Sequence, residues 1–353
     1  MSESTTGTLR AYIGSFTSAG GHGVLAARVD PVTGALTATH ATAAVPDPSY
    51  LTLSPDRATL YAVSEREPDG AAAAFTLHDP DAPEPVSTPV PVGGASPTHL
   101  CVADGHLLTA NYGSGSVSVL PLTEDRAAPG APRHVLRHEG SGPDPDRQEG
   151  PHAHAVLPDP GGRWVLTVDL GTDAVRVCAL DPATGRLTVH RTLDLPPGTG
   201  PRHLTFHPRG HRAYLVGELA STVTALAWDA DAGSLTVSDS AATVPGNAGG
   251  EANYPSEAVV SLDGRFLWVA NRGHDSIAVF TLRGDGDRVE LTDTVSCGGR
   301  WPRDLALGPT GRHLYAANER SGDVTWFEID AATAVPRRAG SLPAPAASCV
   351  TFA

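Results

Sequence analysis

Lysine is absent from the sequence, so all 25 of its basic side chains are arginine. This absence excludes catalysis through a lysine Schiff base and the lysine-dependent phosphate loop of nucleotide-binding proteins. Arginine in place of lysine, with many alanine, glycine and proline residues, indicates a GC-rich genome such as that of an actinobacterium. It also means that any anion is bound by forked guanidinium groups, which suit phosphates and carboxylates.

Aromatic residues, cysteines and long apolar runs are also scarce. Aromatic side chains make up 5% of the chain, which leaves few for a protein-binding face. The four cysteines, Cys101, Cys178, Cys297 and Cys349, are far apart and lie in apolar contexts, so we expect buried free thiols. The net charge of −14 argues against nucleic acid or an acidic membrane as a partner. The N-terminus MSESTTGTLR shows no signal sequence, and we expect a cytoplasmic monomer.

One phrase recurs along the whole chain at intervals of roughly 40 to 50 residues, a period typical of β-propellers. It reads approximately Pro-x-x-Leu-x-Leu-x-Pro-x-Gly-Arg-x-Leu-Tyr-x-Ala-Asn and is clearest in PRHLTFHPRGHRAYLVGEL and PSEAVVSLDGRFLWVANRG. The repeat from Pro201 contains four short strand patterns separated by turns, which is one propeller blade. The sequence therefore predicts an all-β fold of four-stranded antiparallel blades.

Counting the repeats predicts a seven-bladed β-propeller made of one domain, residues 1–353. Six blades start near residues 48, 97, 151, 201, 255 and 302. The seventh combines three N-terminal strands from residues 8–45 with one C-terminal strand from 345–353, which closes the ring and removes exposed sheet edges. Two irregular stretches, 123–149 and 244–254, are expected to be connecting loops, with a lid over one face as the alternative.

Strand direction predicts where chemistry is concentrated. The start of each first strand and the end of each second strand lie on the same face, so their polar residues should surround one mouth of the central channel. The residues after the anchor prolines are Ser49, Thr98, His152, Arg202, Ser256 and Arg303. The residues at the ends of the second strands are Glu65, Asn111, Asp169, Glu218, Asn271, Arg272, Asn318 and Glu319.

Each of these residues also has a structural interpretation. Asn111, Asp169, Asn271 and Asn318 could stabilise turns, and the arginines could form ion pairs between blades. Three arginines at one mouth of an acidic protein nevertheless favour a small anionic ligand. His152 and His154 could lie on one strand face as metal ligands, but no third ligand follows at a recognisable spacing, so we predict no metal.

The motifs NYGSGSVSV, GPHAHAV, DLGTDAVRV, GPRHLTFHP, GEL, DGRFLWVANRGHDSIAVF and WPRDLALGPTGRHLYAAN resemble the seven-bladed β-propeller lactonases. That family includes 6-phosphogluconolactonases and fungal 3-carboxy-cis,cis-muconate lactonizing enzymes. The resemblance implies four catalytic positions, His154, Arg202, Glu218 and Arg272. Glu319 departs from the pattern, because a glutamine would be expected after Asn318 in many relatives.

Together these observations predict a lactonase that needs no cofactor and hydrolyses a sugar-acid lactone, with 6-phosphogluconolactone as the leading candidate. The arginines would bind the anion and the oxyanion, and either His154 or Glu218 would activate water. The residues expected to bind substrate are His152, Arg303, Asn271, Asn318, Glu319 and Asn111. Two alternatives are a cycloisomerase acting on a carboxymuconate and a non-catalytic propeller that binds a partner.

Overall fold

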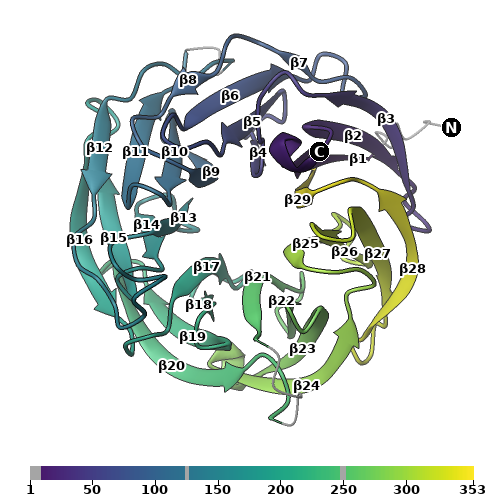
Figure 1. The fold of residues 1–353 in the computed structure, drawn as a ribbon. Helices are drawn as coiled ribbons and strands as arrows, with labels where there is room; N and C mark the ends of the chain where they lie inside the picture. The colour runs from purple at the N-terminus through teal and green to yellow at the C-terminus, as the bar shows by residue number, and fades with distance from the viewer. Residues whose placement is uncertain (1–8, 124–126, 247–251) are drawn as a thin grey trace, which may run out of the picture.

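The computed structural model describes residues 9–123, 127–246 and 252–353. These residues form seven β-sheets arranged as blades around a central channel, as Figure 1 shows. Within the same ranges, helix is limited to two 3-10 turns, η1 (Thr17–Ala19) and η2 (Gly284–Gly286). Neither could cross a membrane. The predicted seven-bladed propeller is confirmed.

The blade from Pro201 shows how the repeat folds. It consists of β17 (Pro201–Phe206), β18 (Arg212–Gly217), β19 (Thr222–Asp229) and β20 (Ser234–Ala242), each paired antiparallel with the next. The first strand lies at the channel and the fourth at the perimeter (Figure 1). Most of β18 is buried because other blades cover both of its faces, whereas β20 is largely exposed. The sequence matches this change from buried to exposed: β18 contains the apolar run AYLVG, whereas β20 reads SLTVSDSAA with many polar residues.

Four more blades repeat this order. Their strands are β9 (Pro97–Ala103), β10 (His106–Asn111), β11 (Ser116–Pro121) and β12 (His134–Arg137); β13 (Ala153–Pro158), β14 (Val165–Asp169), β15 (Ala174–Leu180) and β16 (Leu187–Asp194); β21 (Tyr254–Val260), β22 (Phe266–Arg272), β23 (Ser276–Arg283) and β24 (Arg288–Ser296); β25 (Pro302–Leu307), β26 (His313–Asn318), β27 (Asp323–Ile329) and β28 (Pro336–Pro343).

The blade near residue 48 departs from the four-strand pattern. Its first three strands are β4 (Leu51–Leu53), β5 (Thr59–Ser64) and β6 (Ala71–Thr76), but two short strands, β7 (Glu84–Pro85) and β8 (Val90–Pro91), both pair with β6. Residues 80–91 contain five prolines, and proline has no N–H to donate to a sheet. The outer strand is therefore divided into two pieces.

The last blade closes the ring as predicted. The C-terminal strand β29 (Ala347–Phe352) pairs with β1 (Arg10–Ser15), which continues into β2 (Val24–Val29) and β3 (Leu36–Thr42). The Ser348 hydroxyl donates a hydrogen bond of 2.8 Å to the carbonyl of Ser49 in the neighbouring blade. The two ends of the chain thus meet inside one sheet.

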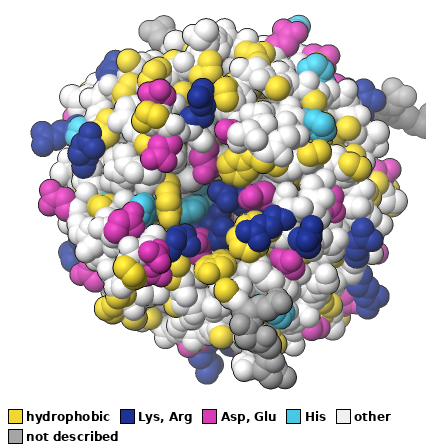
Figure 2. Space-filling view, viewed as in Figure 1, with side chains coloured by type: hydrophobic (Ala, Val, Ile, Leu, Met, Phe, Trp, Pro, Cys, Tyr) yellow, Lys and Arg dark blue, Asp and Glu magenta, His cyan; other side chains and the backbone are white. Residues whose placement is uncertain are grey.

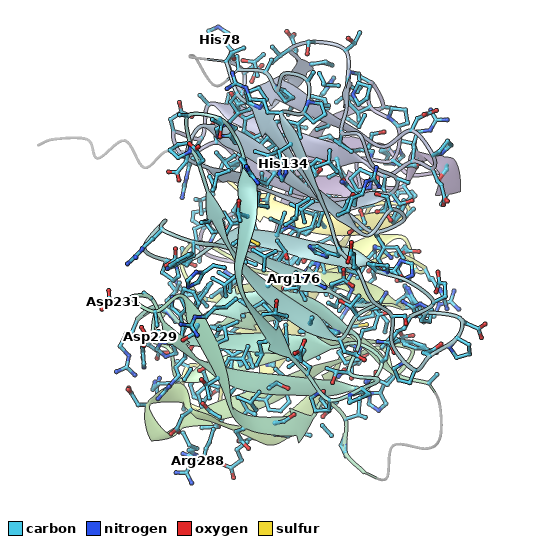
Figure 3. The ribbon with its side chains drawn as sticks, turned by 90° about the vertical axis from the view of Figure 1, so that its left-hand side faces the viewer. His78, His134, Arg176, Asp229, Asp231 and Arg288 are labelled. Carbon is cyan, nitrogen blue, oxygen red and sulfur yellow. The ribbon has the colours of Figure 1, made fainter. Side chains whose placement is uncertain are left out.

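The hydrophobic core lies between neighbouring blades. Trp164, for example, belongs to one blade and packs in a single buried cluster with Leu215 and Trp228 of the next. All four cysteines are buried and free, which confirms that prediction. Charged side chains such as Asp231 and Arg288 point outward from the surface in the side view of Figure 3. Because apolar side chains fill the space between the blades, many of the buried polar groups lie along the central channel.

Candidate active site

A β-bulge at the start of the first strands orients the polar side chains of the channel. Pro97 pairs with Asn111 and His99 with Ala110, so Thr98 is an extra residue in its strand. The same slip occurs in β13, β17, β21, β25 and β29. Bulges redirect side chains and are frequent beside active sites. In each of these strands we count the redirected residue as the one that directly follows the first residue at the bulge, such as Pro97 or Pro201. These residues are Thr98, His154, Arg202, Ser256, Arg303 and Ser348.

This register corrects the predicted position of His152. In the blade from residue 151, Ala153 rather than Pro151 takes the place that Pro201 has in its blade. His154 therefore occupies the position of Arg202, and His152 lies before the strand. The His152 ring stacks on Tyr112 at 4.4 Å and contacts the Glu149 carboxylate at 3.0 Å. It is a neighbour of the pocket described next and does not line it.

Three of the redirected side chains, Thr98, His154 and Arg303, line a pocket of about 200 Å³. Figure 2 shows arginine, acidic and histidine side chains gathered around the central hollow of this face. The residues that line the pocket are Glu65, Thr98, Tyr112, Arg147, His154, Glu218, Arg272 and Arg303. Arg202 lies beside them, within 3.2 Å of Glu218. All four residues implied by the family resemblance are therefore brought together.

Glu218 is the centre of this arrangement. Its buried carboxylate contacts Arg272 at 2.5 Å, Arg147 at 2.7 Å and Arg202 at 3.2 Å. Burial opposes ionisation, but the three guanidinium groups outweigh it and lower the pKa of Glu218 to about 2. Burial and repulsion from Arg272 lower the pKa of Arg202 to about 9. One carboxylate is therefore shared by three cations that repel one another.

A second carboxylate, Glu65, lies on the opposite side of the pocket. The Ser49 hydroxyl donates a short hydrogen bond to it, and Arg303 lies 3.6 Å away. Burial, only partly offset by Arg303, raises the pKa of Glu65. Arg303 also contacts Glu319 of its own blade at 3.3 Å, and its contact with Glu65 joins that blade to the one near residue 48. Glu319 reaches the pocket only through Arg303.

His154 is almost completely buried and borders the pocket. Burial, followed by repulsion from Arg202, holds the pKa of His154 well below its usual value, so the imidazole is neutral at pH 7. Its Nδ1 atom is buried and has no hydrogen-bond partner among the described residues. When Nδ1 carries the hydrogen of the neutral ring, Nε2 can accept a proton.

Arg147 was missed by sequence reasoning. It comes from the irregular stretch 123–149, and besides Glu218 it reaches the Tyr112 hydroxyl at 3.4 Å. Gln148 anchors this segment by donating hydrogen bonds of 2.8 Å to the Leu170 carbonyl and to Asp173. The described part of the loop thus forms one side of the mouth, in line with the lid alternative. No periodic pattern marks Arg147, so only the loop's content of charge could have hinted at it.

The three asparagines expected to bind substrate lie inside the blades. Asn111, Asn271 and Asn318 are fully buried and donate hydrogen bonds to neighbouring side chains and carbonyls, such as Ser118 at 2.8 Å for Asn111. They do not line the pocket, and their contacts join neighbouring strands and connecting segments. Residues 247–251 of the other predicted loop, 244–254, lie outside the described residues.

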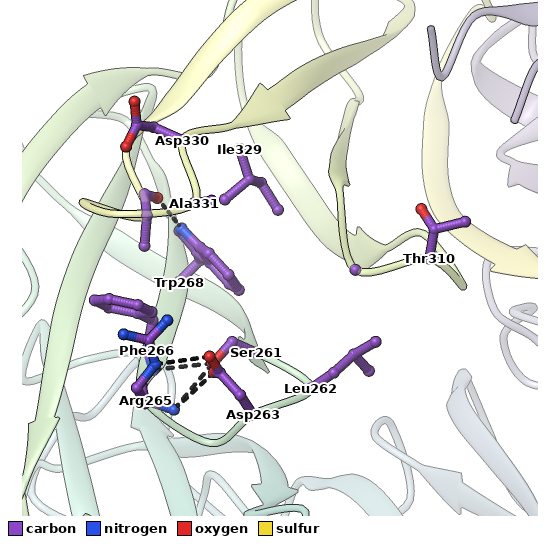
Figure 4. Close-up of a pocket in the computed structure, with 12 residues that line it drawn as sticks. Ser261, Leu262, Asp263, Arg265, Phe266, Trp268, Thr310, Ile329, Asp330 and Ala331 are labelled. Carbon is purple, nitrogen blue, oxygen red and sulfur yellow. Dashed lines mark hydrogen bonds and ion pairs between the residues drawn. The ribbon is translucent and has the colours of Figure 1, made fainter. Parts of the chain in front are cut away.

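Deeper in the channel, the first strands enclose a second polar chamber of about 340 Å³. Its titratable side chains are Tyr50, His99, His203, Glu257 and Asp304, together with the thiols of Cys101 and Cys349. A further pocket, shown in Figure 4, lies between two blades at the turns of Asp263 and Asp330. Its arginine, Arg265, is paired with Asp263 at 2.7 Å, and this pocket lacks the unbalanced charge of the channel mouth.

Comparison with known proteins identifies a common architecture. The family model described as "Lactonase, 7-bladed beta-propeller" matches residues 10–352. The 6-phosphogluconolactonase of Bacillus subtilis is 34% identical over 328 residues, which cover 91% of each chain. A putative 6-phosphogluconolactonase from Bacteroides fragilis superimposes with a TM-score of 0.92 at 28% identity over the full length of both chains. A periplasmic gluconolactonase from Pseudomonas aeruginosa has a TM-score of 0.91 at 28% identity, covering 98% of this chain and 99% of its own.

Proposed function

The chain belongs to the family of seven-bladed β-propeller lactonases, and from that premise we propose that it is a lactone hydrolase whose substrate is 6-phosphogluconolactone. The product would be 6-phosphogluconate. A sugar phosphate does not cross a lipid bilayer unaided, which supports a cytoplasmic site of action.

The observation that carries the choice of substrate is the arginine cluster. Arg147, Arg202 and Arg272 share the single carboxylate of Glu218, and Arg303 lies across the pocket. Even with Glu65 and Glu319 beside Arg303, four arginines face three carboxylates, and in a chain with a net charge of −14 this local excess of positive charge favours an anionic ligand. A phosphate dianion supplies two negative charges and accepts forked hydrogen bonds from guanidinium groups.

We assign the activation of water to His154 rather than to Glu218. Glu218 is a very weak base because its pKa is about 2. The imidazole of His154 borders the pocket and is neutral, so its Nε2 can accept a proton from water as it attacks the lactone carbonyl. Positioned general bases of this kind contribute ~10²–10⁴-fold to the rate. Glu218 is instead a positioning residue that holds its three arginines in place.

The arginines would stabilise the oxyanion that forms when water adds to the carbonyl. Loss of one such donor typically costs ~3 kcal/mol of transition-state stabilisation. Arg202 and Arg272 are the most buried of the four, which suits this role. Arg147 and Arg303 would bind the phosphate. Both parts of the substrate would then be held by groups already in position before it binds.

The experiment that tests the proposal is a direct assay of purified protein. Acid release from freshly made 6-phosphogluconolactone is compared with release from unphosphorylated gluconolactone, and loss of muconate absorbance is measured in parallel. We expect the highest kcat/KM for the phosphorylated lactone and a loss of ~10²-fold or more in His154→Asn. Absence of lactone hydrolysis together with turnover of the muconate would replace the hydrolase by the cycloisomerase.

A further inference from the structure

Directly below the pocket, the imidazole of His203 lies between His154 and Glu257. The rings of His154 and His203 meet edge to face, with centroids 5.2 Å apart and an interplanar angle of 67°. On its other side, His203 Nδ1 shares a short hydrogen bond with Glu257 Oε2. His203 and Glu257 follow the redirected residues Arg202 and Ser256 directly, so the same bulges position both pairs.

Two buried nitrogens on these contacting rings are unsatisfied. His154 Nδ1 and His203 Nε2 have no hydrogen-bond partner within the described ranges of the chain. Buried polar atoms without partners are rare in native proteins and often mark catalytic function. Here the two atoms belong to neighbouring rings that line one channel, which suggests that they are partners of one another during turnover.

We propose that His154, His203 and Glu257 form a proton relay that runs from the pocket into the inner chamber. The relay rests on the proposed lactonase function. When water attacks the lactone carbonyl, the new C–O bond forms, the water O–H bond breaks, and its proton goes to His154 Nε2. The Nδ1 proton of His154 then moves to His203 Nε2, and the Nδ1 proton of His203 moves to Glu257 Oε2.

The second half of the reaction reverses this path. The ring C–O bond of the tetrahedral intermediate breaks, and the leaving oxygen takes up the proton that His154 Nε2 returns. His154 regains its Nδ1 proton from His203, and His203 regains its own from Glu257. The carboxylic acid product loses its remaining proton to solvent. No oxidant, reductant or further reactant is needed, because the relay ends as it began.

Electrostatics explains why His154 needs such a partner. An imidazolium at this position would stand among Arg202, Arg272 and Arg303, and their repulsion together with burial keeps the pKa of His154 well below its usual value. Passing the charge to a carboxylate neutralises it instead of adding a further cation to the cluster. Burial raises the pKa of Glu257 to about 7, so this group can accept and return a proton near neutral pH.

The other groups around His203 do not compete for this role. His99 and Tyr50 contact its ring at centroid distances of 5.2 and 5.8 Å, and burial keeps both neutral at pH 7. Asp304 lies in the same chamber, where burial and then Glu257 raise its pKa well above the usual value. The remaining charges that act on His203 are Arg202, Arg272 and Arg303, which lower its pKa, and Glu218, which raises it.

The relay is tested with Glu257→Gln and His203→Gln, with His99→Gln as the matched control. His99 is a buried histidine of the same chamber that also contacts His203, but it links neither to Glu257 nor to His154 in the proposed path. The pH dependence of kcat is measured from pH 5 to 9 with 6-phosphogluconolactone, after unfolding curves establish that each variant is folded. Ionised Glu257 is the active form, so wild-type kcat should fall as the pH drops through about 7.

In Glu257→Gln we expect kcat to fall ~10- to 100-fold, KM to stay within about twofold, and the acid limb near pH 7 to disappear. His203→Gln should behave alike, and His99→Gln should keep the wild-type profile. The relay is overturned if folded Glu257→Gln retains the wild-type kcat and pH profile, or if His99→Gln loses as much kcat.

Should the variants fail to fold, the wild-type rate is measured in mixtures of H₂O and D₂O. A relay of several protons predicts that the rate depends on the D₂O fraction along a curve, whereas a single proton transfer predicts a straight line and would overturn the relay. A wild-type protein without activity on any lactone would refute the proposed function itself.

Discussion

Replacing Glu218 by glutamine tests the central electrostatic claim. The substitution keeps the shape of the side chain but removes the one negative charge that Arg147, Arg202 and Arg272 share. The pKa of Glu218 falls from 4.5 to about 2, and each unit corresponds to 1.36 kcal/mol, so its ionised form contributes about 3 kcal/mol to folding. Removing one partner of a buried ion pair generally costs a similar ~3–5 kcal/mol.

The assay is thermal unfolding with and without inorganic phosphate. With an unfolding entropy of about 2.1 cal/mol/K per residue and 353 residues, a loss of about 3 kcal/mol lowers Tm by roughly 4 °C. Phosphate should restore more stability to Glu218→Gln than to the wild type, because it replaces the missing anion. The folded-state pKa is lowered, so the stabilisation is fully present above pH 4.5 and lost as the pH falls through about 2. The Tm difference should therefore be the same at pH 7 and pH 5.5.

Glu319→Gln is the matched control. Its carboxylate is 25% exposed, and its ion pair within the described residues is with Arg303 at 3.3 Å, so its loss should cost less than about 1 kcal/mol. A Tm for Glu218→Gln within 1 °C of the wild type, or no lower than that of the control, would refute the reasoning. In turnover, Glu218→Gln should mainly raise KM. A loss of ~10²-fold in kcat with unchanged KM would instead make Glu218 the base.

Three further predictions follow from the same geometry. Deleting Ser348–Ala353 removes most of β29 and exposes the edge of β1, so it should lower the free energy of unfolding by at least about 5 kcal/mol. An unchanged melting temperature would contradict the closure of the ring by this strand. Arg202→Lys should lose kcat as well as raise KM, because an ammonium cannot replace the guanidinium fork, and steady-state kinetics near wild type would count against the oxyanion role. Arg147→Gln should raise KM about tenfold or more for the phosphorylated lactone and leave KM for gluconolactone unchanged, and an equal effect on both substrates would show that Arg147 does not contact the phosphate.

The repeated phrase determined the architecture. Turn residues, short apolar strands and the incomplete repeats at the two ends allow one solution, a ring closed by β29 on β1. Strand direction also brought Arg202, Glu218, Arg272 and Arg303 to one mouth, because backbone geometry fixes the face at which each strand begins and ends. These predictions needed only local periodicity, which the sequence carries directly.

Tertiary structure alone decided how those residues act. The family resemblance named His154, but only the register of β13 shows that His152, two residues earlier, lies outside the pocket, and such a shift cannot be read from a loosely spaced motif. Arg147 reached the pocket from an irregular loop that has no period. The side chain of Asn111 is buried inside its blade, where its amide donates hydrogen bonds to the hydroxyls of Ser116 and Ser118. The basicity of Glu218 and the link between His154, His203 and Glu257 depend on burial and on charges from several blades, and such through-space effects arise only when the ring is closed.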